Sequence, residues 1–288
     1  MKPDPTADHA CPPGATAIPL ASAIGVEIRG VDLAGPLSPG VFEFIRRAWE
    51  ENSLILLRGQ RLTEEDQVRF AERFGPLATM ANPELATTAN PAIMLISNVR
   101  KDGKPIGNLP DGEMQFHSDQ SYVEKPATGS MLYALEIPTA GGNTLFASSF
   151  KAYDDLPARL KSSLDGRLAM HGYDPANSKY MRPVEFGPNV RQFAQPIFRT
   201  HPPTGRKALY VNRLLTQYIV GMPRDESDSV LAELFAHQEQ RKYVYEHAWR
   251  VGDLLFWDNR SCVHARTDFD PRERRMLRRV TLLGERAC

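Results

Sequence analysis

The sequence is poor in cysteine and has no long apolar run. Its three cysteines are Cys11, Cys262 and Cys288, and no two of them form a Cys-x-x-Cys pair. An odd count without paired spacing argues against a disulfide framework and fits a reducing compartment. The N-terminus has no apolar segment of the secretory type, and no apolar run approaches the roughly 18 residues that cross a bilayer. We therefore expect a cytoplasmic protein with no membrane as partner.

The chain also lacks an excess of charge of either sign. Lys plus Arg and Asp plus Glu each number 35, so the formal net charge is zero. This balance gives no reason to expect nucleic acid or an anionic membrane as a partner. A local group of cationic side chains could still bind a small anion. The 42% of hydrophobic residues is typical of a globular protein, and the length permits one or two domains.

Regular alternation of strands and helices is absent too. Residues 1–16 are rich in proline and poor in large apolar side chains, so we expect a disordered tail and one domain over residues 17–288. Apolar patterning predicts short strands within 18–33 and at 54–57, 93–97, 129–137, 144–147, 208–211, 243–249, 253–257 and 277–283. Helices are predicted to begin at 38 and 63 and to cover 150–164 and 225–240, with polar loops at 99–115 and 172–195. This order favours a mostly β core of sandwich or barrel type with flanking helices.

A histidine and a carboxylate two residues apart give the first chemical signal. In a strand, His117 and Asp119 would point to the same face, because residues i and i+2 share a face. They could supply two ligands of a site with two histidines and one carboxylate, which leaves positions open and suits Fe(II) oxygen chemistry. Such a pair also occurs often by chance, and then it only makes hydrogen bonds. A metal site would need a second histidine.

Several histidines are candidates for that third ligand. His264 follows a strand and a turn, which is a good place to present a ligand. The alternatives are one residue in the tail, one before two prolines, one on a polar helix and two candidates for the core: His9, His201, His237, His171 and His247, respectively.

An arginine-rich segment follows His264. It contains Arg266, Arg272, Arg274, Arg275, Arg278 and Arg279. For Arg272 and Arg274 the simplest interpretation is a solvated surface. From Met276 onward, apolar residues alternate with arginines as in a strand, and an inward-pointing arginine would be costly unless it met an anion. A carboxylate is the natural partner of a guanidinium group.

With these features, the chain resembles the taurine and 2,4-dichlorophenoxyacetate dioxygenase family of Fe(II)/2-oxoglutarate oxygenases, from about Ile18 to Gly284. The motifs that carry the resemblance are Leu54–Gln60, Phe70–Leu77, His117-Ser118-Asp119, Gly141–Phe146, Arg199–Pro202, Gly252–Arg260, and His264 with the arginines after it. The resemblance implies a double-stranded β-helix (jelly-roll, cupin-like) core. It also implies an enzyme that uses Fe(II), 2-oxoglutarate and O2.

The resemblance further implies roles for single residues. The matching positions are His117, Asp119 and His264 for iron, Thr144 and Arg275 for 2-oxoglutarate, and Arg279 for the anionic head group of the substrate. By strand parity, Arg275, Leu277 and Arg279 would share one face. Trp257 matches an aromatic residue near the metal, and a role as a core tryptophan fits it equally well.

The sequence departs from the taurine enzymes where these bind their substrate. A His, a Tyr and an Asn of those enzymes fall near Met80, Pro83 and Glu113, and Gln120 replaces an apolar residue. Taurine is therefore not the expected substrate. Gln120 and Tyr173 are expected to line the substrate pocket.

The expected substrate is a small organic anion. An aryloxyalkanoate or another carboxylate ranks first, and an alkyl sulfonate or sulfate ranks second; hydroxylation in natural-product biosynthesis is another use of the same chemistry. The non-catalytic alternative is a cupin-like ligand sensor. The resemblance also implies a homo-oligomer, either a dimer or a tetramer.

Overall fold

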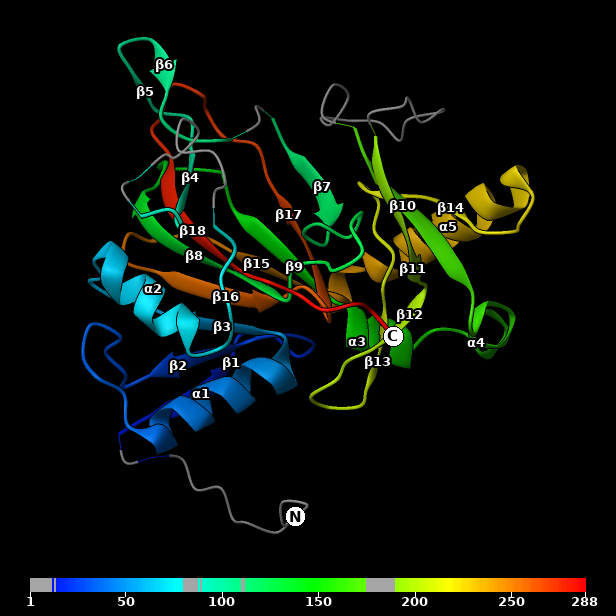
Figure 1. Cartoon of the computed structure of the whole chain (residues 1–288), viewed down its shortest axis with the longest axis horizontal. Coiled ribbons are helices and arrows are strands. Elements are labelled where there is room, and N and C mark those ends of the chain that lie inside the picture. The colour runs from blue at the N-terminus through cyan, green and yellow to red at the C-terminus, as the bar shows by residue number, and fades with distance from the viewer. Residues whose placement is uncertain (1–11, 13, 80–87, 89, 110–111, 175–189) are drawn as a thin grey trace.

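Strands dominate the structure of this protein. The computed structural model describes residues 12, 14–79, 88, 90–109, 112–174 and 190–288. Figure 1 shows two sheets on one side of the molecule, and a group of helices and smaller sheets on the other. The expectation of mostly strands with a few flanking helices is confirmed.

The strands and helices are as follows. The strands are β1 (Thr16–Pro19), β2 (Val26–Arg29), β3 (Leu54–Leu57), β4 (Met94–Ser97), β5 (Arg100–Lys101), β6 (Lys104–Pro105), β7 (Met114–His117), β8 (Gly129–Glu136), β9 (Thr144–Ser148), β10 (Leu168–Tyr173), β11 (Arg191–Pro196), β12 (Phe198–Thr200), β13 (Lys207–Leu209), β14 (Thr216–Ile219), β15 (Val244–His247), β16 (Leu254–Asp258), β17 (Cys262–Arg266) and β18 (Met276–Leu282). The helices are α1 (Pro39–Asn52), α2 (Glu64–Glu72), α3 (Ser149–Asp154), α4 (Ala158–Leu164), α5 (Arg224–Gln238) and the short 3-10 helix η2 (Arg241–Tyr243).

Two sheets form the part of the fold that carries most of the sequence motifs described above. The larger has the order β1-β2-β3-β16-β8-β18-β4, and the smaller has the order β15-β9-β17-β7. Leu54 and Leu56 of β3 pack in a core that also contains Phe146 of β9. Ile55 and Leu57 pack on the other side, against α1. A strand buried on both faces explains why β3 is a continuous apolar run and does not alternate.

Helices α1 and α2 cover the outer face of the larger sheet (Figure 1). Helix α1 begins where the sequence predicts, because the side chain of Ser38 accepts a hydrogen bond from the backbone N–H of Val41. Its Trp49 stacks on Phe256 of β16, with ring centroids 4.3 Å apart. Helix α2 has the predicted capping box at Thr63, although the helix itself ends at Glu72 and only a turn continues to residue 75.

The second part of the fold packs α3, α4 and α5 against strands β10 to β14. The single helix expected at 150–164 is wrong, because α3 and α4 are separate helices. The break falls at Leu156 and Pro157. A residue before proline is disfavoured in the α conformation, and here Pro157 becomes the N-cap of α4.

Two predicted loops contain strands. The segment 99–115 holds the β5–β6 hairpin and the start of β7. The segment 172–195 was predicted to be irregular, but β10 extends to Tyr173, and β11 pairs with β10 from Arg191 onward. Polar strand residues hid these pairings, since apolar patterning detects only buried faces. Residues 175–189 lie outside the described residues.

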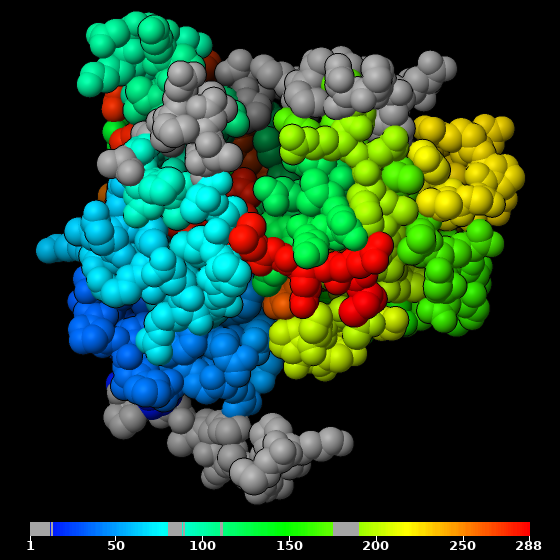
Figure 2. Space-filling model, in the orientation of Figure 1, coloured from blue at the N-terminus to red at the C-terminus, as the bar shows by residue number. Residues whose placement is uncertain are grey.

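The ends of the chain meet the fold at defined points. Of the expected tail, residues 1–11 and 13 lie outside the described residues, whereas Ala15 is buried and Thr16 already begins β1. Figure 2 shows the C-terminal residues crossing the surface between the two parts of the fold. There the backbone N–H of Thr200 donates to the backbone oxygen of Cys288 at 2.7 Å. No helix among the described residues is long and apolar enough to cross a membrane.

Candidate active site

His117, Asp119 and His264 lie together at one end of the smaller sheet. His117 is the last residue of β7, and its backbone pairs in register with that of His264 on β17. The two imidazole rings have centroids 4.1 Å apart. The ligand atoms of the three residues all lie within 4.8 Å of one another. The structure therefore brings the sequence-predicted residues into one group that could hold a metal ion.

Asp119 reaches this group in a different way from the one expected. The strand ends at His117, so the argument that both side chains share a strand face is wrong in its detail. Asp119 lies in the turn that follows, where Gln120 has a left-handed φ of 57°. This turn directs the carboxylate back toward the histidines. The spacing of His117 and Asp119 was therefore informative, but a turn and not a strand brings the two side chains together.

The two oxygens of Asp119 have different surroundings. Oδ1 lies 3.9 Å from Nε2 of His117 and 3.8 Å from Nε2 of His264. Oδ2 accepts a hydrogen bond from Ser130 Oγ at 2.6 Å and lies 2.8 Å from Nη2 of Arg279. Only Oδ1 faces the point that the two imidazole nitrogens share.

The protonation states of His117, Asp119 and His264 suit a metal site. Nδ1 of His117 lies 2.9 Å from the backbone carbonyl of Gln115, which can only accept a hydrogen bond. Nδ1 therefore carries the proton, and the lone pair of Nε2 is free to bind a metal. Burial lowers the pKa of His117. Burial and the neighbouring imidazole of His117 lower the pKa of His264. Burial alone would raise the pKa of Asp119, but Arg279, the two histidines and Ser130 hold it well below its ordinary value. Two neutral imidazoles and one carboxylate are the result.

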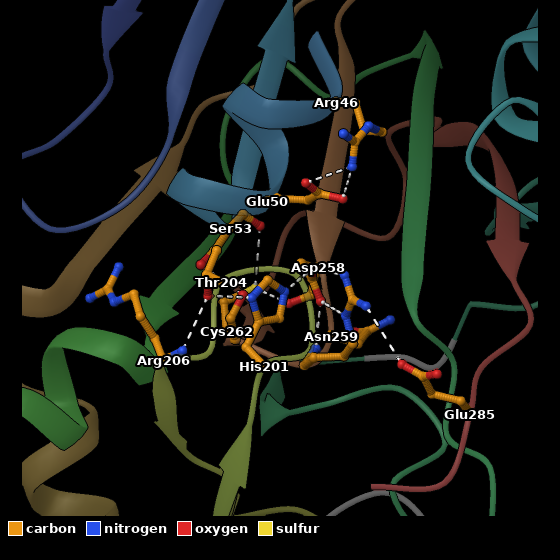
Figure 3. A network of polar contacts seen from close by, with 12 residues as sticks. Arg46, Glu50, Ser53, His201, Thr204, Arg206, Asp258, Asn259, Cys262 and Glu285 are labelled. Carbon is orange, nitrogen blue, oxygen red and sulfur yellow. Dashed lines mark hydrogen bonds and ion pairs between the residues drawn. The ribbon is translucent and has the colours of Figure 1, made fainter. Parts of the chain in front are cut away.

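The other candidate histidines among the described residues have different partners. In the network of Figure 3, Nε2 of His201 lies 3.0 Å from Asp258 and Nδ1 lies 2.8 Å from Thr204 Oγ1. The remaining three contact a serine hydroxyl, an aspartate carboxylate and a backbone carbonyl, and they are His171, His247 and His237, respectively. None of the four lies in the metal-binding group found among the described residues. His9 lies outside them.

A cavity of about 910 Å³ opens at the group. Its lining includes all three proposed ligands and every other predicted site residue: Thr144, Arg275, Arg279, Gln120 and Tyr173. Trp257 also lines it, with its ring centroid 4.7 Å from that of His264. Residues 80–87, which include Met80 and Pro83, lie outside the described residues, and Glu113 is exposed.

Arg275 is buried without a full set of partners. Only 1% of the residue is exposed, and Nη2 donates to the carbonyl of Gly142 at 3.2 Å. Nε and Nη1 have no hydrogen-bond partner among the described residues. Burial, with a smaller contribution from Arg266, lowers the pKa of Arg275 to about 9. A buried guanidinium group in this state needs an anion, and a carboxylate is its natural partner.

The other arginines of the segment divide as the sequence suggests. Arg272 and Arg274 are exposed and pair with Asp270 and Glu136. Arg278 points to the helix-covered face of the sheet, where it donates to the carbonyl of Leu62. Arg275 lies just before β18, and a bulge shifts the register between Met276 and Leu277, yet Arg275 and Arg279 line the same cavity.

Three functional residues were not found from the sequence. Ser130 of β8 and Asn259 hold Asp119, and Trp249 Nε1 donates to Thr144 Oγ1 at 3.0 Å. Ser130 and Trp249 gave no signal in their local sequence, because pairing between distant strands places Ser130, and Trp249 lies in the loop after β15. Asn259 belongs to the Gly252–Arg260 motif, so its position was noted but its contact was not.

Comparisons with known proteins agree with this geometry. Residues 16–281 match the family model described as taurine catabolism dioxygenase TauD, TfdA family. The chain is 34% identical to the alpha-ketoglutarate-dependent 2,4-dichlorophenoxyacetate dioxygenase of Cupriavidus pinatubonensis, over 93% of this chain and 97% of the other. Alpha-ketoglutarate is another name for 2-oxoglutarate.

Solved structures resemble the whole fold. A taurine dioxygenase from Burkholderia xenovorans superposes with a TM-score of 0.80 at 30% identity, covering 96% of this chain and 93% of that one. A second protein, AAD-2 in complex with Mn(II) and N-oxalylglycine, gives a TM-score of 0.78 at 28% identity, covering 95% and 98%.

The site and the comparisons define a metal-dependent oxygenase. The chain belongs to the TauD, TfdA family. It is a 2-oxoglutarate-dependent dioxygenase, it uses iron and 2-oxoglutarate, and it acts on a small molecule with O2. The alternative of a non-catalytic ligand sensor is therefore wrong.

Proposed function

We propose that this enzyme hydroxylates a C–H bond of a small organic anion at an iron site formed by His117, Asp119 and His264. The observation that carries the proposal is the single cavity that these residues share with two arginines, Arg275 and Arg279. One arginine serves the cosubstrate and the other serves the substrate. Two separate cationic positions are what two anions in one cavity require.

The cofactors supply the oxidising chemistry: substrate C–H, O2 and 2-oxoglutarate become C–OH, succinate and CO2. The residues of the chain bind and orient the reactants. Arg275, whose guanidinium group has unpaired donors, would bind the distal carboxylate of 2-oxoglutarate. Because Trp249 donates to Thr144 Oγ1, the hydroxyl proton of Thr144 is available for the same carboxylate. Trp257 and Phe146 pack beside His264 and keep water from that side.

Arg279 orients the substrate in this proposal. Its side chain is 22% exposed, and its Nη1 has no hydrogen-bond partner among the described residues. The favoured substrate is an aryloxyalkanoate or another carboxylate, in line with the similar 2,4-dichlorophenoxyacetate dioxygenase. Gln120 and Tyr173 would contact the rest of the substrate, since both line the cavity. If the hydroxylated carbon carries an ether oxygen, the product fragments.

The test begins with the apoprotein under anaerobic conditions. Fe(II) and then 2-oxoglutarate are added, and the weak visible absorption of the ternary complex is recorded. We expect the band in the wild type and in Arg272→Ala, the exposed control, and its loss in His117→Ala and strong weakening in Arg275→Ala. A wild-type titration without the band, together with no succinate release for any anionic substrate, would contradict the proposal.

A substrate panel addresses the substrate class. Succinate release is measured with phenoxyacetates, other carboxylates, alkyl sulfonates and sulfate esters, and the products are identified by mass spectrometry. Higher kcat/KM for carboxylates than for sulfonates or sulfate esters supports the favoured class. The reverse order assigns the enzyme to the sulfonate or sulfate class, which the similar fold of the Burkholderia taurine dioxygenase keeps in view. Turnover only with a larger terpenoid-like acid would indicate natural-product hydroxylation.

We also propose that the two main sheets form a double-stranded β-helix within one dioxygenase domain at residues 17–288. Their shared apolar core supports this. A cytoplasmic homo-oligomer, dimer or tetramer, completes the proposal. Light scattering on the purified enzyme and fractionation of cells would test its assembly and location.

A further inference from the structure

We propose that Ser130 and Arg279 are positioning residues that present only Oδ1 of Asp119 to the metal. This inference rests on the proposed iron site and concerns how its carboxylate is held. Ser130 donates a hydrogen bond to the other oxygen, Oδ2, at 2.6 Å, and Nη2 of Arg279 forms an ion pair with the same oxygen at 2.8 Å. A carboxylate oxygen has two lone pairs, and Oδ2 already has two close polar contacts. Bidentate binding of a metal by Asp119 would have to break one of these contacts.

The hydroxyl of Ser130 has its direction set by its other partners. Nδ2 of Asn259 and Nη2 of Arg279 each lie 3.3 Å from Ser130 Oγ, and both can only donate. The hydroxyl proton must therefore point to Asp119. Ser130 itself is fully buried on β8, where its backbone pairs with Trp257 on one side and Thr281 on the other. It is a fixed point in the centre of the larger sheet.

Asn259 holds the backbone of Asp119 in place. Its Oδ1 accepts hydrogen bonds from the backbone N–H of Asp119 at 3.3 Å and from Nε1 of Trp257 at 2.9 Å. Its carbonyl oxygen accepts from Ser118 Oγ at 2.7 Å. Asn259 lies in the turn between β16 and β17, next to the buried pair of His201 and Asp258 in Figure 3. The turn that carries Asp119 is thus attached to the larger sheet by side-chain contacts.

In this arrangement Arg279 holds the metal-binding carboxylate and also binds the substrate anion. Nη2 contacts both Asp119 and Ser130, so the side chain is fixed before any substrate binds. Its other terminal nitrogen is left for the substrate anion. One guanidinium group would therefore connect the metal carboxylate with the substrate, and removing it should affect metal binding even when no substrate is present.

The test measures metal binding alone, with Mn(II) as the probe and without 2-oxoglutarate or substrate. Ser130→Ala should raise the Kd for Mn(II) roughly tenfold or more, as for other residues that orient a metal ligand. Its Co(II) absorption spectrum should also change, which loss of packing alone would not produce. Ser130→Thr, which keeps the hydroxyl, should restore both. Ser97→Ala is the matched control, because Ser97 is also a buried strand serine but contacts the backbone of Val99.

Arginine variants give an independent measurement. Arg279→Lys keeps the positive charge but loses the planar group that spans Asp119 and Ser130, so we expect weaker Mn(II) binding. Arg278→Lys, on the opposite face of the same strand, should bind Mn(II) as the wild type does. Wild-type Mn(II) affinity and an unchanged Co(II) spectrum in Ser130→Ala would overturn the inference and leave the proposed function standing. Failure of the wild type to bind Mn(II) would instead contradict the iron site itself.

Discussion

The indole nitrogen of Trp249 donates a hydrogen bond to the hydroxyl oxygen of Thr144, at 3.0 Å, inside the structure. Both residues are buried, and Thr144 begins β9 at the wall of the cavity. The contact uses a lone pair of the hydroxyl and leaves its proton free. The hydroxyl of Thr144 can therefore donate a hydrogen bond to a ligand in the cavity that Arg275 also lines.

Thr144→Val should therefore weaken 2-oxoglutarate binding while the fold is kept. The variant has nearly the same shape but loses one hydrogen bond to a charged group, so we expect KM for 2-oxoglutarate to rise roughly tenfold or more. Trp249→Phe removes only the orienting contact and should have a smaller effect. Thr139→Val, at an exposed threonine bound to Glu273, is the control. An unchanged KM in Thr144→Val would show that the hydroxyl does not contact the cosubstrate.

Arg275 should destabilise the apoprotein, but it should be necessary for binding 2-oxoglutarate. Its buried guanidinium group has two donors without partners, and burial depresses its pKa to about 9. Arg275→Met should raise the free energy of unfolding of the apoprotein, by about 1 to 4 kcal/mol by analogy with other buried charges that were replaced by apolar side chains. The same variant should no longer gain thermal stability from Fe(II) and 2-oxoglutarate.

Urea unfolding of the apoprotein and thermal shifts with ligand would measure the two effects. Arg274→Met, at an exposed arginine paired with Glu136, should change neither by much. A clear loss of stability in apo Arg275→Met would mean that the guanidinium group is already satisfied without a ligand.

The sequence predicted the parts of this site that depend on motifs and missed the parts that depend on pairing between distant strands. The His-x-Asp spacing and the arginines behind His264 identified residues that the structure places in one cavity. The reason given for the first pair was wrong, because Asp119 lies in a turn. Apolar patterning cannot distinguish a ligand that ends a strand from one that follows it, and Gln120 gives little warning of a left-handed conformation.

The fold shows the same division. Continuous apolar segments such as β3 and capped helices such as α1 and α2 were predicted closely. The pairing of β11 with β10 was missed, because Arg191 and Gln192 are polar and exposed. The role of Ser130 could not be predicted at all, since only the folded arrangement of β8 and the turn after β7 brings it near Asp119.

His171 should make the stability of the protein depend on pH in the acid range. It is fully buried near Ser121 and Thr216, and burial lowers its pKa to about 3 from an ordinary value of 6.5. Above pH 6.5 the residue is neutral in both the folded and the unfolded chain. Below pH 6.5 the unfolded chain takes up a proton that the folded chain refuses, so stability falls as the pH falls toward 3. At pH 4.5 the loss should be about 3 kcal/mol.

Urea unfolding of the wild type and of His171→Gln between pH 7.5 and 4.5 would measure this contribution. The wild type should be the more stable of the two at pH 7.5, and this advantage should shrink as the pH falls. A constant difference between the two proteins over the whole range would show that His171 does not carry the effect.

Gln120 offers a way to separate the backbone from the side chain at the substrate end of the cavity. Its φ of 57° is left-handed, a region that glycine and asparagine adopt easily and β-branched residues avoid. Gln120→Gly should therefore keep the turn that carries Asp119, with wild-type Mn(II) affinity and wild-type KM for 2-oxoglutarate. Because it removes a side chain that lines the cavity, it should change KM for the substrate.

Gln120→Val is the complementary variant. It should strain the turn, destabilise the protein by about 1 kcal/mol or more and weaken Mn(II) binding, since Asp119 would no longer be held in place. Substrate kinetics of Gln120→Gly that match the wild type for every substrate of the panel would remove Gln120 from the substrate contacts. Its function would then lie in the turn alone, where the left-handed residue directs the metal carboxylate toward the two histidines.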